Sequence, residues 1–225
     1  MKKIIFIVVL GLGVLLSGCG LGGGIDKEEE AESEKQGKKV AALEESEILD
    51  AGEGEIFTID LEKSKVLWQA ERIIGHSHKG DVKIKQGEIR LSDGEFVSGY
   101  FVMDMDTIQD VGNNESLIKH LKSDDFFSVK EFPEAELVIT GVEKVDEKQY
   151  DVYAGLTIKG IEESIVFPAI VEIAEDRIHA QASFDIDRTR WGIKYDSGQF
   201  FKDLADKAIK DKISFEIEIF ASITE

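Results

Sequence analysis

The stretch Ile213-Ser214-Phe215-Glu216-Ile217-Glu218-Ile219-Phe220-Ala221 alternates apolar and polar side chains almost without interruption. Successive side chains of a β-strand point to opposite faces of the sheet, so this period of two places one row inside and one row outside. The segment 178–186 repeats the pattern, with Ala180, Ala182 and Phe184 in the apolar row. Both segments are therefore expected to be strands that bury one face.

Seven earlier segments have similar β-type patterns, and they lie at 56–60, 65–73, 81–91, 96–105, 136–142, 150–158 and 165–173. Turn-forming residues separate several of them, including Ser92-Asp93-Gly94, Asp146-Glu147-Lys148 and Glu175-Asp176. The segments follow one another without the helical crossovers that parallel strands need. Eight or nine antiparallel strands are thus predicted, and such a set forms either a sandwich or a closed barrel.

Two segments depart from the period of two and indicate short helices between strands. The first follows the capping residues Asn113 and Asn114 and places three apolar side chains on one helical face: Leu117, Ile118 and Leu121. The second spans 201–209 and spaces three small or apolar residues in the same way: Leu204, Ala205 and Ala208. We expect both helices to cover an open end of a barrel.

The N-terminus has the pattern of an exported lipoprotein. Two lysines follow Met1, and the apolar run 4–16 is too short to span a bilayer comfortably. Leu16-Ser17-Gly18-Cys19 then resembles the lipobox of bacterial lipoproteins, in which cleavage leaves the cysteine as a diacylated N-terminal residue. Cys19 is the single cysteine of the chain, so the mature domain can contain no internal disulfide. Two acyl chains suffice for stable membrane anchoring.

Composition divides the remainder into a tether and a folded domain. Residues 20–54 are rich in Gly, Glu, Lys, Ala and Ser and bury too little apolar surface to fold. The expected organisation is therefore a signal peptide with its lipobox at 1–19, a flexible acidic tether at 20–54 and a β-barrel domain at 55–225. Because Gly20 rather than Asp follows the lipobox cysteine, we expect an envelope lipoprotein of the outer membrane that faces the periplasm.

The charge of the chain excludes some partners. Asp and Glu total 46 against 27 Lys and Arg, a formal net charge of −19. Nucleic-acid binding requires a basic surface that neutralises phosphates, so nucleic acid is not an expected partner. Direct electrostatic adhesion to anionic lipid headgroups is not expected for the same reason.

Several local strings occur in an order that resembles a known family. Gly75-His76-Ser77-His78-Lys79-Gly80 follows the strand that holds Trp68, and the later strings are Ser98-Gly99-Tyr100-Phe101-Val102-Met103-Asp104-Met105, His120-Leu121-Lys122-Ser123-Asp124-Asp125-Phe126-Phe127, Phe132-Pro133, Gly155-Leu156-Thr157-Ile158-Lys159-Gly160, Phe167-Pro168, Asp187-Arg188-Thr189 and Trp191-Gly192-Ile193. Together they resemble the YceI-like family over about 55–225, lipocalin-shaped periplasmic proteins associated with binding polyisoprenoids and other long-chain lipids. The resemblance implies an extended, antiparallel eight-stranded barrel whose apolar interior holds an isoprenoid chain.

Alternation parity identifies the expected inward wall of such a barrel. The candidate ligand-binding residues are Trp68, Phe101, Met103, Phe167, Phe184, Phe215 and Ile217. From the residues alone the interior is either filled by side chains or hollow enough for one slender ligand. We therefore predict a membrane-tethered binding protein for a long-chain isoprenoid or similar lipid, with no catalytic residues and no cofactor. A structural or interaction lipoprotein with a filled barrel is an alternative.

The histidines define the other alternative, a metal-assisted enzyme. His76 and His78 are two residues apart and face one side if the chain is extended, with His120 as a third candidate ligand. A zinc or copper site needs three or four donors, and no further spacing signal is present, so no metal site is expected. His179 lies in the polar row of its strand and is expected to be solvated.

Asp187 and Arg188 are adjacent, so on an extended strand they point to opposite faces. We expect them to form a barrel corner together with Trp191, or else a polar clamp for the head of a ligand.

Overall fold

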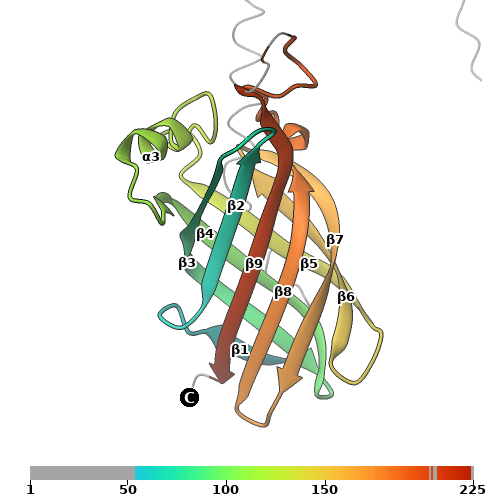
Figure 1. The fold of residues 1–225 in the computed structure, drawn as a ribbon. Helices are drawn as coiled ribbons and strands as arrows, with labels where there is room; N and C mark the ends of the chain where they lie inside the picture. Colours follow the sequence, from blue (N-terminus) through green and yellow to red (C-terminus); the bar gives the residue numbers. More distant parts are fainter. Residues whose placement is uncertain (1–53, 203, 205–206, 224–225) are drawn as a thin grey trace, which may run out of the picture. The chain divides into compact units, whose positions relative to one another are not determined.

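A computed structural model describes residues 54–202, 204 and 207–223 of the chain. These residues form nine strands, one α-helix and one short 3-10 helix (Figure 1). The strands are β1 (Glu55–Ile59), β2 (Lys65–Arg72), β3 (Ser77–Ser92), β4 (Glu95–Asp110), β5 (Glu134–Lys144), β6 (Gln149–Ile158), β7 (Ile161–Ile173), β8 (Arg177–Asp187) and β9 (Ile209–Ile223). The helix α3 (Glu115–Leu121) lies between β4 and β5, and the 3-10 helix η1 (Arg188–Trp191) follows β8. The predicted leader, Cys19 and all but the last residue of the predicted tether lie outside the described residues.

The strands form one antiparallel sheet that closes on itself. Their order is β1-β3-β2-β9-β8-β7-β6-β5-β4, and the pairing of β3 with β4 closes the ring. β1 and β2 each pair with both β3 and β9, so they occupy a single position of the ring in succession. The result is a barrel with eight strand positions, which confirms the predicted fold class and decides against the sandwich.

Two hairpins use turns that need a positive φ at both central residues. Asp93 and Gly94 have φ values of 52° and 76° between β3 and β4, and Lys159 and Gly160 have 53° and 68° between β6 and β7. This geometry matches the right-handed twist of the paired strands, and it favours glycine because glycine has no Cβ. These short connections fix the register of the hairpins that they join.

The connections gather at two ends of the barrel, which we call the closed end and the mouth end. The closed end carries the connections 93–94, 145–148 and 174–176, while 60–64 lies in the wall between β1 and the β2 that continues it. The mouth end, uppermost in Figure 1, carries 73–76, 111–133, 159–160 and 188–208. The two long connections and both helices are therefore at the mouth end.

The first predicted helix is present, and the second is not. Asn114 caps α3 by accepting a hydrogen bond from the backbone N–H of Leu117 at 3.1 Å, as its sequence predicts. The described residues of 201–209 contain no α-helix, so that expectation is wrong. Sheet pairing takes precedence there, because Ala208 accepts a hydrogen bond from the N–H of Ile73 and Ile209 begins β9. None of the described helices has the length and apolarity that a membrane crossing requires.

The ladder between β7 and β8 covers only part of their length. Their backbones pair from Ala169 to Ile173. The ladder stops at Pro168, which lies within β7 and has no N–H to donate. Side chains join the two strands beyond that point, since the rings of Phe167 and Phe184 stack with centroids 4.4 Å apart.

Candidate functional site: an apolar cavity inside the barrel

A cavity of about 280 Å³ lies inside the barrel. Side chains from β2 to β9, from α3 and from the connection after η1 line it, and nearly all of them are apolar. The polar lining residues belong to the mouth end, apart from Gln181 on β8: Glu71, Arg72, His78, His120, Arg188 and Tyr195. Because the exposed Arg72 is among them, the cavity reaches the surface at this end.

The structure places all seven sequence-predicted ligand-binding residues on the wall of this cavity. They are Trp68 on β2, Phe101 and Met103 on β4, Phe167 on β7, Phe184 on β8, and Phe215 and Ile217 on β9. Trp68 and Phe184 both pair with Phe215 across neighbouring strands. With the Phe167 stack they form a continuous aromatic wall, in which the rings of Phe184 and Phe215 lie 5.6 Å apart. Whether the seven contact a ligand stays a prediction.

The inward row of β8 and β9 shows that the barrel is hollow. Ala182, Phe184, Ile213, Phe215 and Ile217 are only partly buried, although they face the interior. Interior side chains of a close-packed core are covered by neighbours on all sides. The uncovered area of these five therefore faces the cavity, which answers the question of filled or hollow that the sequence left open.

The closed end is sealed by large side chains that do not line the cavity. Phe57, Leu91, Tyr150 and Ile178 are at most 3 % exposed. Tyr150 meets Phe96 edge to face, with ring centroids 5.8 Å apart. These residues thus close the barrel at this end, and a ligand can enter the cavity from the mouth end.

Part of the wall at the mouth comes from residues outside the strands. Leu121 of α3 is buried, and the ring of His120 meets the rings of Phe126 and Tyr195 edge to face, at 5.0 and 4.6 Å between centroids. The His120–Tyr195 contact joins α3 to the connection 188–208. Alternation says nothing about residues in connections, so only the helical face with Leu117 and Leu121 signalled this part of the wall.

Two pairs of ionisable groups lie at the mouth. Lys210 donates a hydrogen bond to Glu71, and this bond lowers the pKa of the Glu71 carboxyl. His78 Nδ1 lies 3.5 Å from a carboxylate oxygen of the buried Asp110, whose other oxygen accepts a hydrogen bond from the N–H of Asn114. No sequence pattern indicated this partner for His78.

The histidines do not converge on one point. His76 lies outside β3 and its carbonyl accepts a hydrogen bond from the N–H of Arg72, while His120 Nε2 lies 3.2 Å from Asp125. His179 lies on the outer face, where it stacks on Phe220 and contacts Glu218 at 3.1 Å. Across 54–202, 204 and 207–223, no three His, Cys, Asp or Glu side chains are grouped closely enough to hold a metal ion. The geometry therefore does not favour the metal-assisted alternative.

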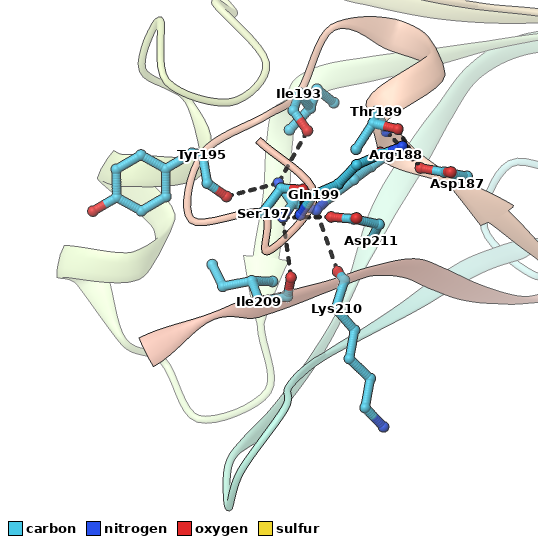
Figure 2. A network of polar contacts seen from close by, with 10 residues as sticks. All are labelled: Asp187, Arg188, Thr189, Ile193, Tyr195, Ser197, Gln199, Ile209, Lys210 and Asp211. Atoms are coloured by element: carbon cyan, nitrogen blue, oxygen red, sulfur yellow. Dashed lines mark hydrogen bonds and ion pairs between the residues drawn. The ribbon is translucent and has the colours of Figure 1, made fainter. Parts of the chain in front are cut away.

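Arg188 fixes the corner between β8 and β9, as Figure 2 shows. The guanidinium is 2 % exposed, and its donors are committed to four backbone carbonyls and one carboxylate: Ile193, Tyr195, Ile209, Lys210 and Asp211. Burial lowers the pKa of Arg188, and the neighbouring carboxylate of Asp211 opposes that shift. Because a guanidinium has five N–H donors and all five bonds are made within the protein, none is left for a ligand head. The corner interpretation is thus favoured over the polar clamp.

The residues beside Arg188 complete this corner. Asp187 caps η1 by accepting hydrogen bonds from the N–H and the hydroxyl of Thr189 at 2.9 and 2.7 Å. Trp191 is fully buried and donates its indole N–H to the carbonyl of Leu156 at 2.9 Å. The sequence string therefore serves to hold the mouth end together.

A closed antiparallel barrel with an apolar cavity open at one end defines a lipocalin-like binding fold. The sequence model of the YceI-like domain matches residues 57–221, and the chain belongs to this family.

Curated relatives match only in part. A UPF0312 protein of Pseudomonas putida strain W619 is 37 % identical over 67 residues, which cover 30 % of this chain and 35 % of the relative. A UPF0312 protein of Pseudomonas savastanoi pv. phaseolicola is 40 % identical over 57 residues, which cover 25 % of this chain and 30 % of the relative. The matches thus span about a third of these relatives.

Solved structures share the fold over a larger part of the chain. BcnA of Burkholderia cenocepacia superposes with a TM-score of 0.62 at 21 % identity, covering 73 % of this chain and 99 % of BcnA. A polyisoprenoid binding domain from Saccharophagus degradans gives 0.57 at 12 % identity, covering 76 % and 100 %. Both neighbours are thus matched over almost their whole length.

Proposed function

We propose that this protein binds a long-chain apolar lipid, of the isoprenoid type, inside its barrel. The observation that carries the proposal is the inward row of β8 and β9, whose apolar side chains are left partly uncovered around a cavity. The Saccharophagus degradans neighbour is a polyisoprenoid binding domain, and this supports the choice of ligand class.

Binding in this site would be driven by burial of the chain. Each methylene group that leaves water contributes about 0.8 kcal/mol, so a long hydrocarbon needs few polar contacts to bind tightly. The aromatic wall of Phe167, Phe184 and Phe215 offers flat apolar surface along the length of such a chain. This function requires no bond-breaking step, no catalytic residue and no cofactor.

The test is native mass spectrometry of the purified protein with two matched carboxylate substitutions on β8. Phe184→Asp places an unpaired carboxylate in the cavity, where it is desolvated and either protonates or repels the chain. Ser183→Asp places the same group on the exposed outer face of the same strand. We expect the Phe184 variant to lose its lipid-sized adduct and the Ser183 variant to keep it.

A second variant separates the loss of lipid binding from the loss of folding. Ala182→Phe keeps the wall apolar but fills part of the cavity, and it should also reduce the adduct while circular dichroism shows an intact sheet. An adduct of equal size and abundance in all folded variants would place the lipid elsewhere and would contradict the proposal.

We also propose that the protein is an envelope lipoprotein anchored through Cys19, in the outer membrane and facing the periplasm. The support is the sequence pattern that ends in Leu16-Ser17-Gly18-Cys19. A Cys19→Ser precursor should remain unprocessed at this site and lack the diacylglyceryl mass. Normal maturation and membrane partition of that variant would contradict the anchor.

A further inference from the structure

Four exposed apolar side chains lie at the mouth end, and we call them the apolar rim. Ile73 and Ile74 lie in the connection between β2 and β3, and Phe200 and Phe201 lie in the connection between β8 and β9. Each is 45–57 % exposed. Single exposed apolar residues are common on protein surfaces, whereas several large ones on one part of the surface indicate an interaction site.

Backbone contacts attach both halves of the rim to the same short segment, 208–209. The N–H of Ile73 donates to the carbonyl of Ala208 at 2.9 Å, so the first connection is attached to the chain just before β9. Ser197 bridges to Ile209, and its carbonyl accepts hydrogen bonds from the N–H groups of Phe200 and Phe201 at 3.1 and 3.0 Å. The two phenylalanines therefore belong to the same edge of the barrel as Ile73.

The base beneath the rim is buried and fixed. Ser197 is fully buried, and Arg188 binds the carbonyls of Tyr195 and Ile209 on either side of it (Figure 2). The rim residues thus project outward from an ordered corner. The hydrogen-bonded backbone of this corner holds them in their exposed positions.

We propose that the apolar rim docks on the surface of a lipid bilayer, so that the mouth of the cavity faces the membrane. Phenylalanine and isoleucine on loop tips insert into the boundary between headgroups and acyl chains, where their burial provides the binding energy. The inference rests on the proposed lipid-binding function for its purpose, since a cavity that opens onto a membrane exchanges chains without passing them through water.

The distribution of charge favours this orientation. The segments 72–76 and 197–202 contain no carboxylate and carry Arg72 and Lys202, although Glu71, Asp196 and Asp203 flank them. The three closed-end connections carry five carboxylates and one lysine. An anionic bilayer repels the closed end more strongly than the rim, so docking at the mouth end is consistent with the high net negative charge of the chain.

The proposed tether permits the same orientation. β1 pairs at Glu55 with Leu91 beside the closed end, so the chain enters the barrel at the end away from the rim. The 34 residues 20–53 span at most roughly 110–120 Å when extended. β9, with 15 residues, is about 50 Å long. A chain anchored at Cys19 can therefore pass the whole barrel and let the rim reach the same membrane.

The test is flotation of residues 20–225, which lack the leader and Cys19, with vesicles of phosphatidylethanolamine and phosphatidylglycerol. The rim variant carries Ile73→Ser, Ile74→Ser, Phe200→Ser and Phe201→Ser. The control variant carries four serines at exposed apolar positions of the outer wall: Leu67→Ser, Tyr153→Ser, Val166→Ser and Ile170→Ser. We expect the control to float like the unmodified protein and the rim variant to float at least tenfold less.

Absence of flotation for the unmodified protein, or equal flotation of the rim and control variants, would overturn the proposal. Light scattering tests a second occupant of the rim. If the unmodified protein is a dimer and the rim substitutions abolish the dimer without changing flotation, the rim contacts a second copy of the chain and the proposal is overturned. The proposed function is tested separately by the Phe184→Asp variant. That variant should lose lipid and float normally, whereas the rim variant should keep lipid loaded from detergent and take up lipid from vesicles more slowly.

Discussion

The two ends of the barrel are built from the same kinds of residue and differ in how those residues are covered. Phe57 at the closed end is fully buried and touches no cavity, whereas Phe215 on the wall below the mouth is partly uncovered. Short turns cross the closed end, while the connections 111–133 and 188–208 surround the mouth. One end therefore supplies the stability of the sheet, and the other leaves space for a ligand.

The largest effect should distinguish a packed phenylalanine from a cavity-lining one. Phe57→Ala removes a ring covered on all sides and should lower the free energy of unfolding by about 3–5 kcal/mol. Phe215→Ala removes a ring that already faces a cavity, so its loss should be about half as large. Equilibrium unfolding in guanidinium chloride measures both. Equal losses would mean that the mouth half is packed as tightly as the closed end.

The second effect concerns the corner that holds the mouth end together. Arg188→Met should lower the free energy of unfolding by about 3 kcal/mol, because it leaves buried carbonyls, among them those of Ile193 and Tyr195, without a donor. Arg190→Met is the matched control, since Arg190 is exposed and bonds Glu163 at 2.7 Å on the surface. Its loss should stay below about 1 kcal/mol. Similar losses in both variants would show that burial of the guanidinium does not govern the stability of this corner.

The sequence predicted the walls of the barrel far better than its interior or its mouth. Alternation identified every strand and the inward side of residues such as Phe184 and Phe215, because a period of two depends only on local geometry. It could not distinguish filled from hollow, since that depends on which side chains meet across the barrel. The mouth was harder to predict still. The segment 201–209 has helical spacing, yet Ala208 and Ile209 are drawn into the sheet by Ile73 and Arg72, residues distant in sequence.

A third, smaller effect is expected on the outer wall near the mouth end. Partial burial raises the pKa of Glu136, and the nearby carboxylates of Glu134 and Glu162 raise it further. A carboxyl whose pKa is higher in the folded state makes the protein less stable as pH rises from the ordinary glutamate value through the raised one. Glu136→Gln should therefore increase stability at pH 7 by roughly 0.5 kcal/mol and have no effect below about pH 4.

Thermal unfolding at both pH values measures this difference. Glu134→Gln is the control, because Glu134 accepts a hydrogen bond from Lys85 and its removal should not stabilise the protein. A loss of stability in the Glu136 variant at pH 7 would show that the carboxylate is favourably paired in the folded state.

The smallest effect should come from an ion pair at the closed end, where the sign is opposite. The Lys144 ammonium donates hydrogen bonds to both carboxylate oxygens of Glu95 at 2.8 Å, and these bonds lower the pKa of Glu95 and raise that of Lys144. A carboxyl with a lowered pKa adds stability above its unfolded pKa, and that stability is lost as pH falls through the folded value. Lys144→Met should therefore lower the melting temperature slightly at pH 7, while the variant and the unmodified protein converge below about pH 4. Since both groups are exposed, added salt should also narrow the gap in melting temperature between the variant and the unmodified protein. A gap that persists at low pH and high salt would instead assign the loss to the packing of the lysine stem against Tyr150, whose ring centroid lies 5.9 Å from the ammonium. In that case apolar contact would stabilise even the charged surface of the closed end.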